Sequence, residues 1–198
     1  MKLALFDFDG TISYKDSMLD FIQYAVGKPS FYWGLLLLSP MLAAYKLKLI
    51  PNDIAKEKLI THFFAGWHYS QFNEVASNYS RERIKKIIRP NMLEKIRWHQ
   101  QQKHDVVVVS ASMESWLKYW CKEQGIDLIA TQLEIIDGKI TGKFAGKNCH
   151  GVEKVNRIKQ QYSLSAYKTI YAYGDSSGDK AMLAIADIPY YKGEAVYK

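Results

Sequence analysis

The run 3–12, Leu-Ala-Leu-Phe-Asp-Phe-Asp-Gly-Thr-Ile, is the feature that most constrains the fold of this chain. A short apolar stretch leads into two carboxylates, Asp7 and Asp9, and the glycine after them lets the chain turn away. At the end of a strand both acids can face one crevice, and open α/β sheets place ligands there, outside the carboxyl ends of their strands. Paired carboxylates suit a divalent cation and covalent chemistry at phosphorus, although two solvated acids would have the same sequence.

Strand and helix patterns alternate through the second half of the chain, whereas the first half is helical. Apolar runs predict strands at 2–6, 105–110, 127–131, 168–174 and 189–191. Helical spacing of apolar residues predicts helices at 17–26, 52–64, 70–88, 91–103, 114–124, 151–162 and 177–186. A hairpin is expected within 133–144, turning at Asp137-Gly138. Alternating β and α segments imply a parallel sheet with helices on both faces.

The predicted fold class is therefore α/β, a doubly wound parallel sheet with an inserted α-helical cap. Residues 1–13 and 90–198 are expected to form the catalytic core, and residues 14–89 the cap. A chain of 198 residues can form one domain that carries such an insertion. The inserted segment is larger than a typical loop, so it is expected to have a packed structure of its own.

Three further stretches follow the first one in order along the chain. The apolar run 106–109 ends in Ser110, Lys154 follows a turn at Gly151, and the strand pattern at 171–174 ends in Asp175, with Asp179 four residues on. Together with Asp-Phe-Asp-Gly-Thr, this set resembles the four motifs of the haloacid dehalogenase-like (HAD) phosphohydrolase superfamily, from residue 3 to about residue 188. An insertion between motifs I and II is similar to that of subfamily IB, the phosphoserine phosphatase-like enzymes.

The resemblance implies a Mg²⁺-dependent reaction with a role for each acid. Asp7 would be the nucleophile, which forms an aspartyl phosphate that water later hydrolyses. Asp9 would be the general acid and base, and its presence favours phosphoryl chemistry over carbon–halogen cleavage. The metal would be held by Asp7, by Asp175 and by the backbone carbonyl of Asp9. Asp179 would support the metal's water ligands, and a plain acid in the first turn of a helix is an equal alternative for it.

The same resemblance implies that Ser110 and Lys154 hold the transferring phosphoryl oxygens. Ser112 is a competing candidate for Ser110, and an ordinary hydroxyl at a strand end is the simpler alternative for either. For Lys154 the alternative is a solvated lysine on an amphipathic helix, as is expected of Lys147 and Lys159. The place of Lys154 just after the Gly151 turn favours the phosphate-binding role.

Asp16 lies nine residues after the expected nucleophile, the spacing at which phosphoserine phosphatases have a glutamate that binds the substrate amine. A shorter acid matches this pattern imperfectly. The sequence also shows no counterpart of the cap arginine that binds the substrate carboxylate in those enzymes. Asp16 is therefore a candidate for substrate specificity, and phosphoserine is a candidate substrate that the pattern does not favour.

Composition limits the partners and the compartment. The net charge of +7 and a pI near 9.2 favour anionic partners, namely phosphate esters, nucleic acid or acidic lipid. No nucleic-acid-binding motif is visible, so no nucleic-acid partner is expected. Cys121 and Cys149 lack metal-ligand spacing and suggest a reducing compartment. The first apolar run is too short for a signal peptide, so a cytoplasmic location is expected.

The segment 29–45 contains no charged residue, and Lys46 and Lys48 follow it. It is short for a bilayer span and contains Pro40, so the simplest interpretation is an apolar helix pair packed on the core. A membrane-surface element is the alternative, with peripheral membrane contact through residues 29–48. The segment is similar to one in the bacterial phosphatidylglycerophosphate phosphatase branch of the subfamily.

These patterns predict a Mg²⁺-dependent phosphomonoesterase that acts on a small organic or lipid phosphate monoester. A phosphotransferase or phosphomutase would use the same aspartyl phosphate and pass it to an alcohol. A non-catalytic basic binding module for nucleic acid or acidic membrane is the remaining alternative. The motifs do not separate the first two, and the third would make the complete motif set a coincidence.

Overall fold

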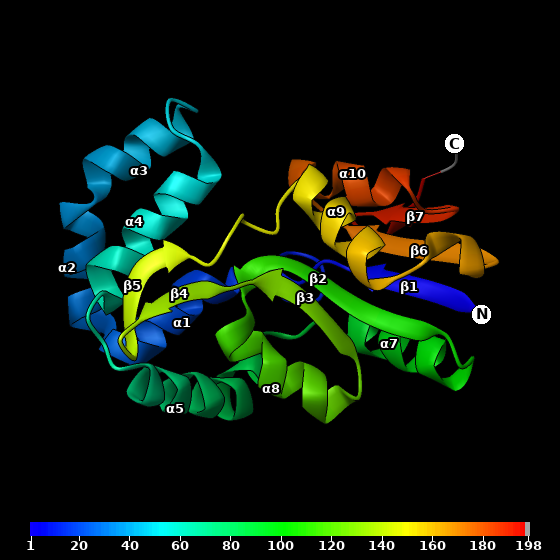
Figure 1. Cartoon of the computed structure of the whole chain (residues 1–198), viewed down its shortest axis with the longest axis horizontal. Coiled ribbons are helices and arrows are strands. Elements are labelled where there is room, and N and C mark those ends of the chain that lie inside the picture. Colours follow the sequence, from blue (N-terminus) through cyan, green and yellow to red (C-terminus); the bar gives the residue numbers. More distant parts are fainter. Residues whose placement is uncertain (197–198) are drawn as a thin grey trace.

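The computed structural model describes residues 1–196 and contains a six-stranded sheet in the order β3-β2-β1-β6-β7-β8 (Figure 1). All neighbouring strands are parallel except β7 and β8, which pair antiparallel. The strands are β1 (Lys2–Phe6), β2 (Asp105–Met113), β3 (Asp127–Thr131), β6 (Thr169–Gly174), β7 (Ile188–Tyr191) and β8 (Glu194–Ala195). This arrangement confirms the predicted α/β class with its mainly parallel sheet.

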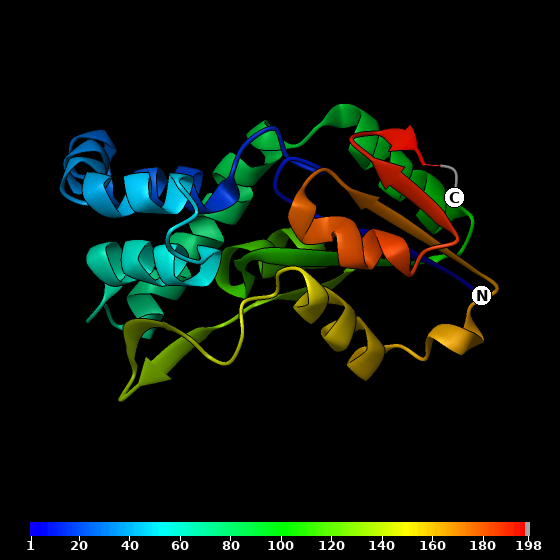
Figure 2. The same ribbon diagram turned by 90° about the horizontal axis from the view of Figure 1, so that it is seen from above.

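The sheet is buried on both faces because each central strand is apolar on both sides. Ala4 and Phe6 of β1 belong to one core cluster, whereas Leu3 and Leu5 belong to the other. The first face is covered by α7 (Pro90–Gln101) and α8 (Glu114–Gln124), and the second by α9 (Val152–Gln161) and α10 (Lys180–Ala184). Figure 2 shows α7 on one side of the sheet and α9 and α10 on the other.

A helical segment connects β1 to β2 and lies beyond the carboxyl ends of the strands (Figure 1). We call residues 14–89 the helical insertion. Its elements are α1 (Ser17–Val26), α2 (Lys28–Leu37), α3 (Ser39–Lys46), α4 (Asn52–Phe64), α5 (Tyr69–Tyr79), a π-helical turn (Ser80–Ile84) and α6 (Lys85–Ile87). The division of the chain into a core and a cap at residues 14 and 89 stays a prediction.

The predicted hairpin packs against this insertion. It consists of β4 (Leu133–Ile136) and β5 (Lys139–Phe144), and Asp137 and Gly138 at its turn both have positive φ, of 48° and 71°. Positive φ at both central residues is the geometry that the Asp-Gly pair favours. The Gly66 amide donates to Ile140 O at 2.8 Å, and the Ile140 amide donates to Trp67 O at 3.0 Å, so the hairpin is tied to the segment after α4.

Several element boundaries differ from the sequence prediction. The apolar run before residue 50 forms two helices, because Pro40 lies in the first turn of α3, where a proline starts a new helix readily. Strand β2 continues past Ser110, with an irregular register up to Met113. The predicted helix 177–186 is a 3₁₀ turn, Ser177–Asp179, followed by the short α10. Strand β8 was not predicted. Helix α4 begins at Asn52 as predicted, directly after Pro51.

Candidate active site

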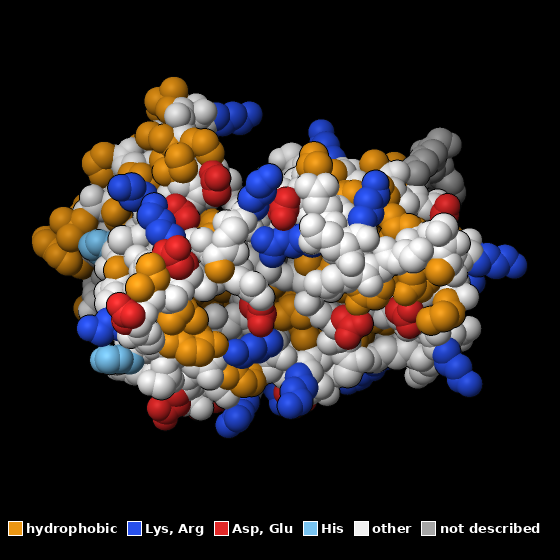
Figure 3. Space-filling model, viewed as in Figure 1, with side chains coloured by type: hydrophobic (Ala, Val, Ile, Leu, Met, Phe, Trp, Pro, Cys, Tyr) orange, Lys and Arg blue, Asp and Glu red, His pale blue; other side chains and the backbone are white. Residues whose placement is uncertain are grey.

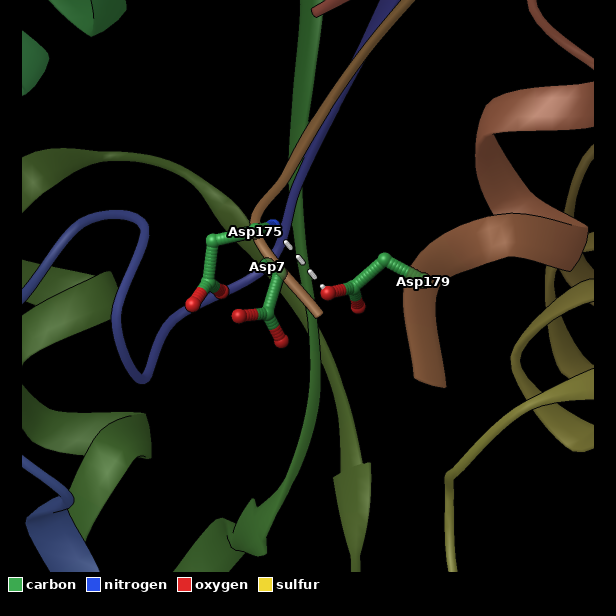
Figure 4. A group of neighbouring side chains, drawn as sticks. All are labelled: Asp7, Asp175 and Asp179. Atoms are coloured by element: carbon green, nitrogen blue, oxygen red, sulfur yellow. Dashed lines mark hydrogen bonds between the residues drawn. The ribbon is translucent and has the colours of Figure 1, made fainter. Parts of the chain in front are cut away.

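Two adjacent parallel strands each end in an aspartate at the same edge of the sheet. Asp7 follows β1 and Asp175 follows β6, and β1 and β6 are paired so that Phe6 lies opposite Tyr173. The Asp7 amide donates to Tyr173 O at 2.9 Å, which extends this pairing into the site. One carboxylate oxygen from each of Asp7, Asp175 and Asp179 lies within 4.8 Å of the others (Figure 4). The topology therefore brings together three acids that are far apart in sequence.

Gly10 lets the loop after β1 pass close to Asp175. Its φ of +87° is unfavourable for residues with a side chain, and an added Cβ would lie 2.3 Å from Asp175 Oδ2. Thr11 Oγ1 donates to Asp175 Oδ1 at 3.1 Å, so the same loop also orients this carboxylate. The Gly-Thr pair is thus needed for the position of Asp175 as well as for the turn.

Lys154 is a buried cation that connects three acceptors. Its Nζ lies 2.6 Å from Asp7 Oδ1, 2.7 Å from Asp179 Oδ1 and 2.7 Å from Val109 O. An ammonium group has three donors, so all three are satisfied although the side chain is 2% exposed. Burial lowers the pKa of Lys154, but the carboxylates of Asp7 and Asp179 outweigh burial and hold this pKa above its ordinary value. Lys154 is therefore not the solvated lysine of the alternative interpretation.

Burial has the opposite consequence for Asp7. It raises the pKa of Asp7 to about 7, and the positive charge of Lys154 opposes this rise without cancelling it. Additional positive charge nearby would stabilise the ionised form of this buried carboxylate. Asp175 is less buried, and burial raises its pKa as well. The two acids together form an oxygen-rich site for a hard cation.

Asp179 is occupied by hydrogen bonds that shape the loop after β6. Its Oδ2 accepts from the Asp175 amide at 3.2 Å, from the Ser176 amide at 2.9 Å and from Ser176 Oγ at 2.7 Å, while Oδ1 binds Lys154. Burial would raise the pKa of Asp179, but Lys154 and Ser176 hold it below its ordinary value. With these partners Asp179 positions Asp175 and Lys154. This geometry suits a supporting residue better than a direct metal ligand.

Asp9 is held apart from this cluster by two partners that the sequence did not associate with it. The Ser17 amide donates to Asp9 Oδ1 at 2.7 Å, and Ser112 Oγ donates to Asp9 Oδ2. Ser17 Oγ in turn donates to Ser112 Oγ at 2.9 Å. Burial, with a smaller contribution from the charge of Asp16, raises the pKa of Asp9 to about 6. A carboxyl group with a pKa near neutrality can both give and take a proton at working pH.

Ser110 and Ser112, the two candidate phosphate-binding serines at the end of β2, have different hydrogen-bond partners. Ser112 contacts Asp9, whereas Ser110 is buried and its Oγ accepts from the Ser112 amide at 3.0 Å. Ser110 directly follows Val109, whose carbonyl binds Lys154, so it lies beside the acidic cluster. A hydroxyl oxygen that accepts can still donate its hydrogen to another oxygen. A phosphate-binding role for Ser110 stays a prediction.

Lys56 is a residue of the site that sequence reasoning missed. It belongs to α4 of the helical insertion, and its Nζ donates to Ala111 O at 2.9 Å, between the two serines of β2. Burial lowers its pKa, while the nearby charges of Asp9, Asp16 and Asp7 oppose this shift. No local signal distinguishes Lys56 from the exposed Lys58 on the same helix, because only the packing of the insertion on the core selects it.

Asp16 has a local structural role. It is the N-cap of α1, and its Oδ1 accepts from the Leu19 amide at 3.0 Å. Its charge nevertheless contributes to the pKa values of both Asp9 and Lys56, so it lies on the same side of the site. Substrate recognition by Asp16 stays a prediction.

A buried aspartate paired with a lysine, next to a second aspartate from the adjacent strand, suits the class of proteins that transfer a phosphoryl group to a carboxylate. The model of the family described as haloacid dehalogenase-like hydrolase matches residues 4–184. Protein CicA of Caulobacter vibrioides is 33% identical over 192 residues, which are 96% of this chain and 85% of CicA. The probable phosphatase Rv3661 of Mycobacterium tuberculosis is 31% identical over 91% of this chain and 64% of its own length.

A solved structure described as a phospho-aspartyl intermediate analogue of phosphoserine phosphatase has the same fold. It superposes with a TM-score of 0.67 at 18% identity and covers 95% of this chain and 84% of its own. The chain belongs to the haloacid dehalogenase-like hydrolase family, and it is a phosphatase of that family.

Proposed function

We propose that this phosphatase hydrolyses a phosphate monoester through an aspartyl phosphate on Asp7, with Mg²⁺ as its cofactor. The observation that carries this proposal is the pairing of Asp7 with Lys154 at 2.6 Å inside the acidic cluster of Asp7, Asp175 and Asp179. A buried carboxylate next to a fixed cation can approach an anionic phosphoryl group that a free carboxylate would repel.

In the first step an oxygen of Asp7 attacks phosphorus, and the bond from phosphorus to the ester oxygen breaks. Asp9, in its protonated form, gives its proton to the leaving alkoxide, so the products are an alcohol and the aspartyl phosphate. The Ser17 amide and Ser112 Oγ hold Asp9 in one orientation for this transfer. We propose that Lys154 and Ser110 bind the phosphoryl oxygens, on which negative charge is concentrated. Lys154 would do so through an N–H that donates to one of its three protein acceptors in this structure.

In the second step a water molecule attacks the same phosphorus atom, and the bond from phosphorus to Asp7 breaks. Asp9, now a carboxylate, takes a proton from this water, which restores both acids and releases inorganic phosphate. The helical insertion acts as a cap in this scheme, because water must be excluded in the first step and admitted in the second.

The residues of the site fit Mg²⁺. This ion prefers oxygen ligands and retains several water molecules, so the carboxylates of Asp7 and Asp175 with the backbone carbonyl of Asp9 are sufficient. Asp179 keeps its four hydrogen-bond contacts and orients Asp175. When bound, the metal supplies positive charge that offsets repulsion between the nucleophile and the phosphate.

The substrate is a small organic or a lipid phosphate monoester whose leaving group lies between the insertion and the core. Lys56 of α4 adds a cation at this boundary, next to Asp9 and Asp16. A cavity of about 580 Å³ opens on the same boundary, and its lining mixes polar side chains, Asn52, Asn148 and His150 among them, with the apolar Pro51 and Phe144. The polar side chains offer hydrogen bonds to the alcohol or headgroup next to the phosphate.

Phosphate release from a panel of esters, with and without Mg²⁺, tests this function. The panel contains soluble esters, phosphoserine among them, and phosphatidylglycerophosphate in detergent, with Asp7→Asn as the blank. We expect Mg²⁺-dependent release from at least one ester, with a higher KM in Lys56→Ala and an unchanged KM in the matched control Lys58→Ala. Full activity of Asp7→Asn would contradict the proposal. Transfer of phosphate to added alcohols instead of water would identify a phosphotransferase.

A further inference from the structure

Helices α2 and α3 are apolar on nearly all sides, yet the fold buries little of them. In α2 only Phe31 and Gly34 are buried, and in α3 no residue is. Gly34 packs tightly, since a Cβ at this position would lie 2.4 Å from Phe63 of α4. A helix that is apolar all round normally lies in a protein core or in contact with lipid. One side of this helix pair therefore meets the fold, and the other side lacks an apolar environment.

The large apolar side chains exposed on this protein concentrate here. Among residues 1–196, fifteen large apolar side chains are exposed, and seven of them lie between residues 32 and 49. On α2 they recur at four-residue spacing, Tyr32 with Leu36 and Trp33 with Leu37, which places them on one face of the helix. We define the α2–α3 surface as Tyr32, Trp33, Leu36, Leu37, Leu47 and Leu49, which are 55–73% exposed. Figure 3 shows apolar side chains gathered at the end of the molecule that these helices form.

The charge around this surface has one sign. Lys28, Lys46 and Lys48 flank it and are exposed, and the sequence contains no Asp or Glu from residue 28 to residue 52. Apolar and aromatic side chains between lysines are typical of segments that lie in the headgroup region of an anionic bilayer. None of the helices in residues 1–196 combines the length and the apolar character needed to cross a bilayer.

We propose that the α2–α3 surface docks on the surface of an anionic phospholipid bilayer. Tyr32 and Trp33 have the amphipathic rings that favour the membrane–water interface, and the leucines supply the area that enters it. A second copy of this chain fits less well, because a two-fold interface would bring the lysines of both copies together. This docking does not depend on the proposed phosphatase chemistry, although it would bring a lipid phosphate ester close to the enzyme.

Vesicle co-sedimentation tests the docking, with Asp7→Asn as the background so that no lipid is hydrolysed. Vesicles of phosphatidylcholine alone are compared with vesicles that also contain phosphatidylglycerol. The test variant is Trp33→Gln with Leu37→Gln. Its matched control is Trp98→Gln with Ile136→Gln, since Trp98 and Ile136 are also exposed, and Ile136 and Leu37 are each 55% exposed. Thermal melting and, without the Asp7 change, hydrolysis of a soluble ester verify that both variants are folded.

We expect binding to vesicles with phosphatidylglycerol, weak binding to phosphatidylcholine alone and loss of binding at high salt. The test variant should bind at least about tenfold more weakly, because it loses two apolar side chains from the interface. The control variant should bind as the parent does. Lys46→Gln and Lys48→Gln should each weaken binding by about fivefold. Binding to neither vesicle, equal binding by the test variant, or a dimer that the test variant dissociates in the absence of vesicle binding would overturn the proposal.

Discussion

Lys154 lies 2.6 Å from Asp7 and 2.7 Å from Asp179. One buried cation therefore joins the end of β1 to the turn after β6. These residues are 147 and 25 positions apart in sequence from Lys154. The pairing serves two purposes, since it offsets part of the charge of two buried acids and it holds the cation next to the carboxylate on which we propose that the phosphoryl group forms.

Lys154→Met should remove both functions of this cation. Asp7 and Asp179 would remain buried without their partner, and breaking a buried pair in this way costs about 3–5 kcal/mol of unfolding free energy. We expect kcat/KM to fall at least about a hundredfold, as on removal of a donor that stabilises the transition state. Urea unfolding and steady-state kinetics measure the two effects. The exposed Lys159→Met on the same helix is the control, and full activity in Lys154→Met would contradict the role assigned to this lysine.

Asp9→Asn should slow both half-reactions while substrate still binds. The amide keeps the shape of the side chain but cannot transfer the proton. General acid–base catalysis typically increases the reaction rate by about 10²–10⁴-fold. We expect kcat to fall by this factor and the dissociation constant of a non-hydrolysable phosphonate analogue to stay nearly unchanged. Asp137→Asn at the exposed hairpin turn is the control, because asparagine also tolerates positive φ there. A kcat of Asp9→Asn equal to that of the wild type would exclude Asp9 as the general acid and base.

Mg²⁺ should stabilise the folded protein through Asp7 and Asp175. At a concentration one hundred times the Kd, a ligand that binds only the folded state adds about 2.7 kcal/mol. For a chain of this size that corresponds to a rise in Tm of roughly 5–10 °C. Calorimetry with Mg²⁺ and with a chelator measures it. The rise should vanish in Asp175→Asn and persist in Asp137→Asn, a turn position where asparagine also tolerates positive φ. An equal rise in Asp175→Asn would place the metal elsewhere.

His99 should contribute a loss of stability in mild acid. This residue is fully buried, with Nδ1 at 2.8 Å from His104 Nδ1 and Nε2 at 2.8 Å from the Tyr173 hydroxyl oxygen. Burial, with repulsion from His104, Lys95 and Lys2, lowers the pKa of His99 to about 4. The unfolded chain therefore takes up a proton near pH 6.5 that the folded chain refuses until near pH 4, and the free energy of unfolding decreases as the pH falls between them.

The contribution of His99 is at most about 3 kcal/mol between pH 7 and pH 4. Urea unfolding at a series of pH values measures it as a slope. Asp7 and Asp9, whose pKa values are raised, act in the opposite sense, so the prediction concerns the difference between variant and wild type. On going from pH 7 to pH 4, His99→Gln should lose less stability, or gain more, than the wild type, whereas the exposed His68→Gln should keep the slope of the wild type. Identical slopes in His99→Gln and the wild type would show that the pKa of His99 is not lowered.

The strands and the four motif positions were predictable from the sequence because they depend on local patterns. An apolar run that ends in Asp7 or Asp175 marks the edge of the sheet whatever its neighbours are, and the family resemblance supplies their order. The partners Ser17 and Ser112 of Asp9 were not predictable as such. They meet only because β2 runs past Ser110 and α1 begins next to it.

The role of Lys56 and the exposure of the α2–α3 surface were not predictable from the sequence either. The helix α4 was predicted correctly, but nothing in its sequence states which lysine faces the core. The uncharged segment before residue 46 was expected first as a buried helix pair. In the structure Phe31 and Gly34 are buried, and four further side chains pack partly buried against the core, namely Leu35, Leu38, Met41 and Leu42. The opposite face of α2, with Tyr32, Trp33, Leu36 and Leu37, is exposed. Which side of an evenly apolar helix is buried depends on its tertiary neighbours.

The most direct test of the central claim is to identify the residue that carries the phosphoryl group. The enzyme is mixed with substrate and Mg²⁺, quenched rapidly and treated with borohydride, which reduces an aspartyl phosphate to homoserine. The tryptic peptide 3–15 contains both Asp7 and Asp9, so fragmentation in the mass spectrometer distinguishes them. We predict homoserine at residue 7 and an unchanged Asp9. Homoserine at residue 9, or unmodified peptide under conditions in which phosphate is released, would contradict covalent catalysis by Asp7.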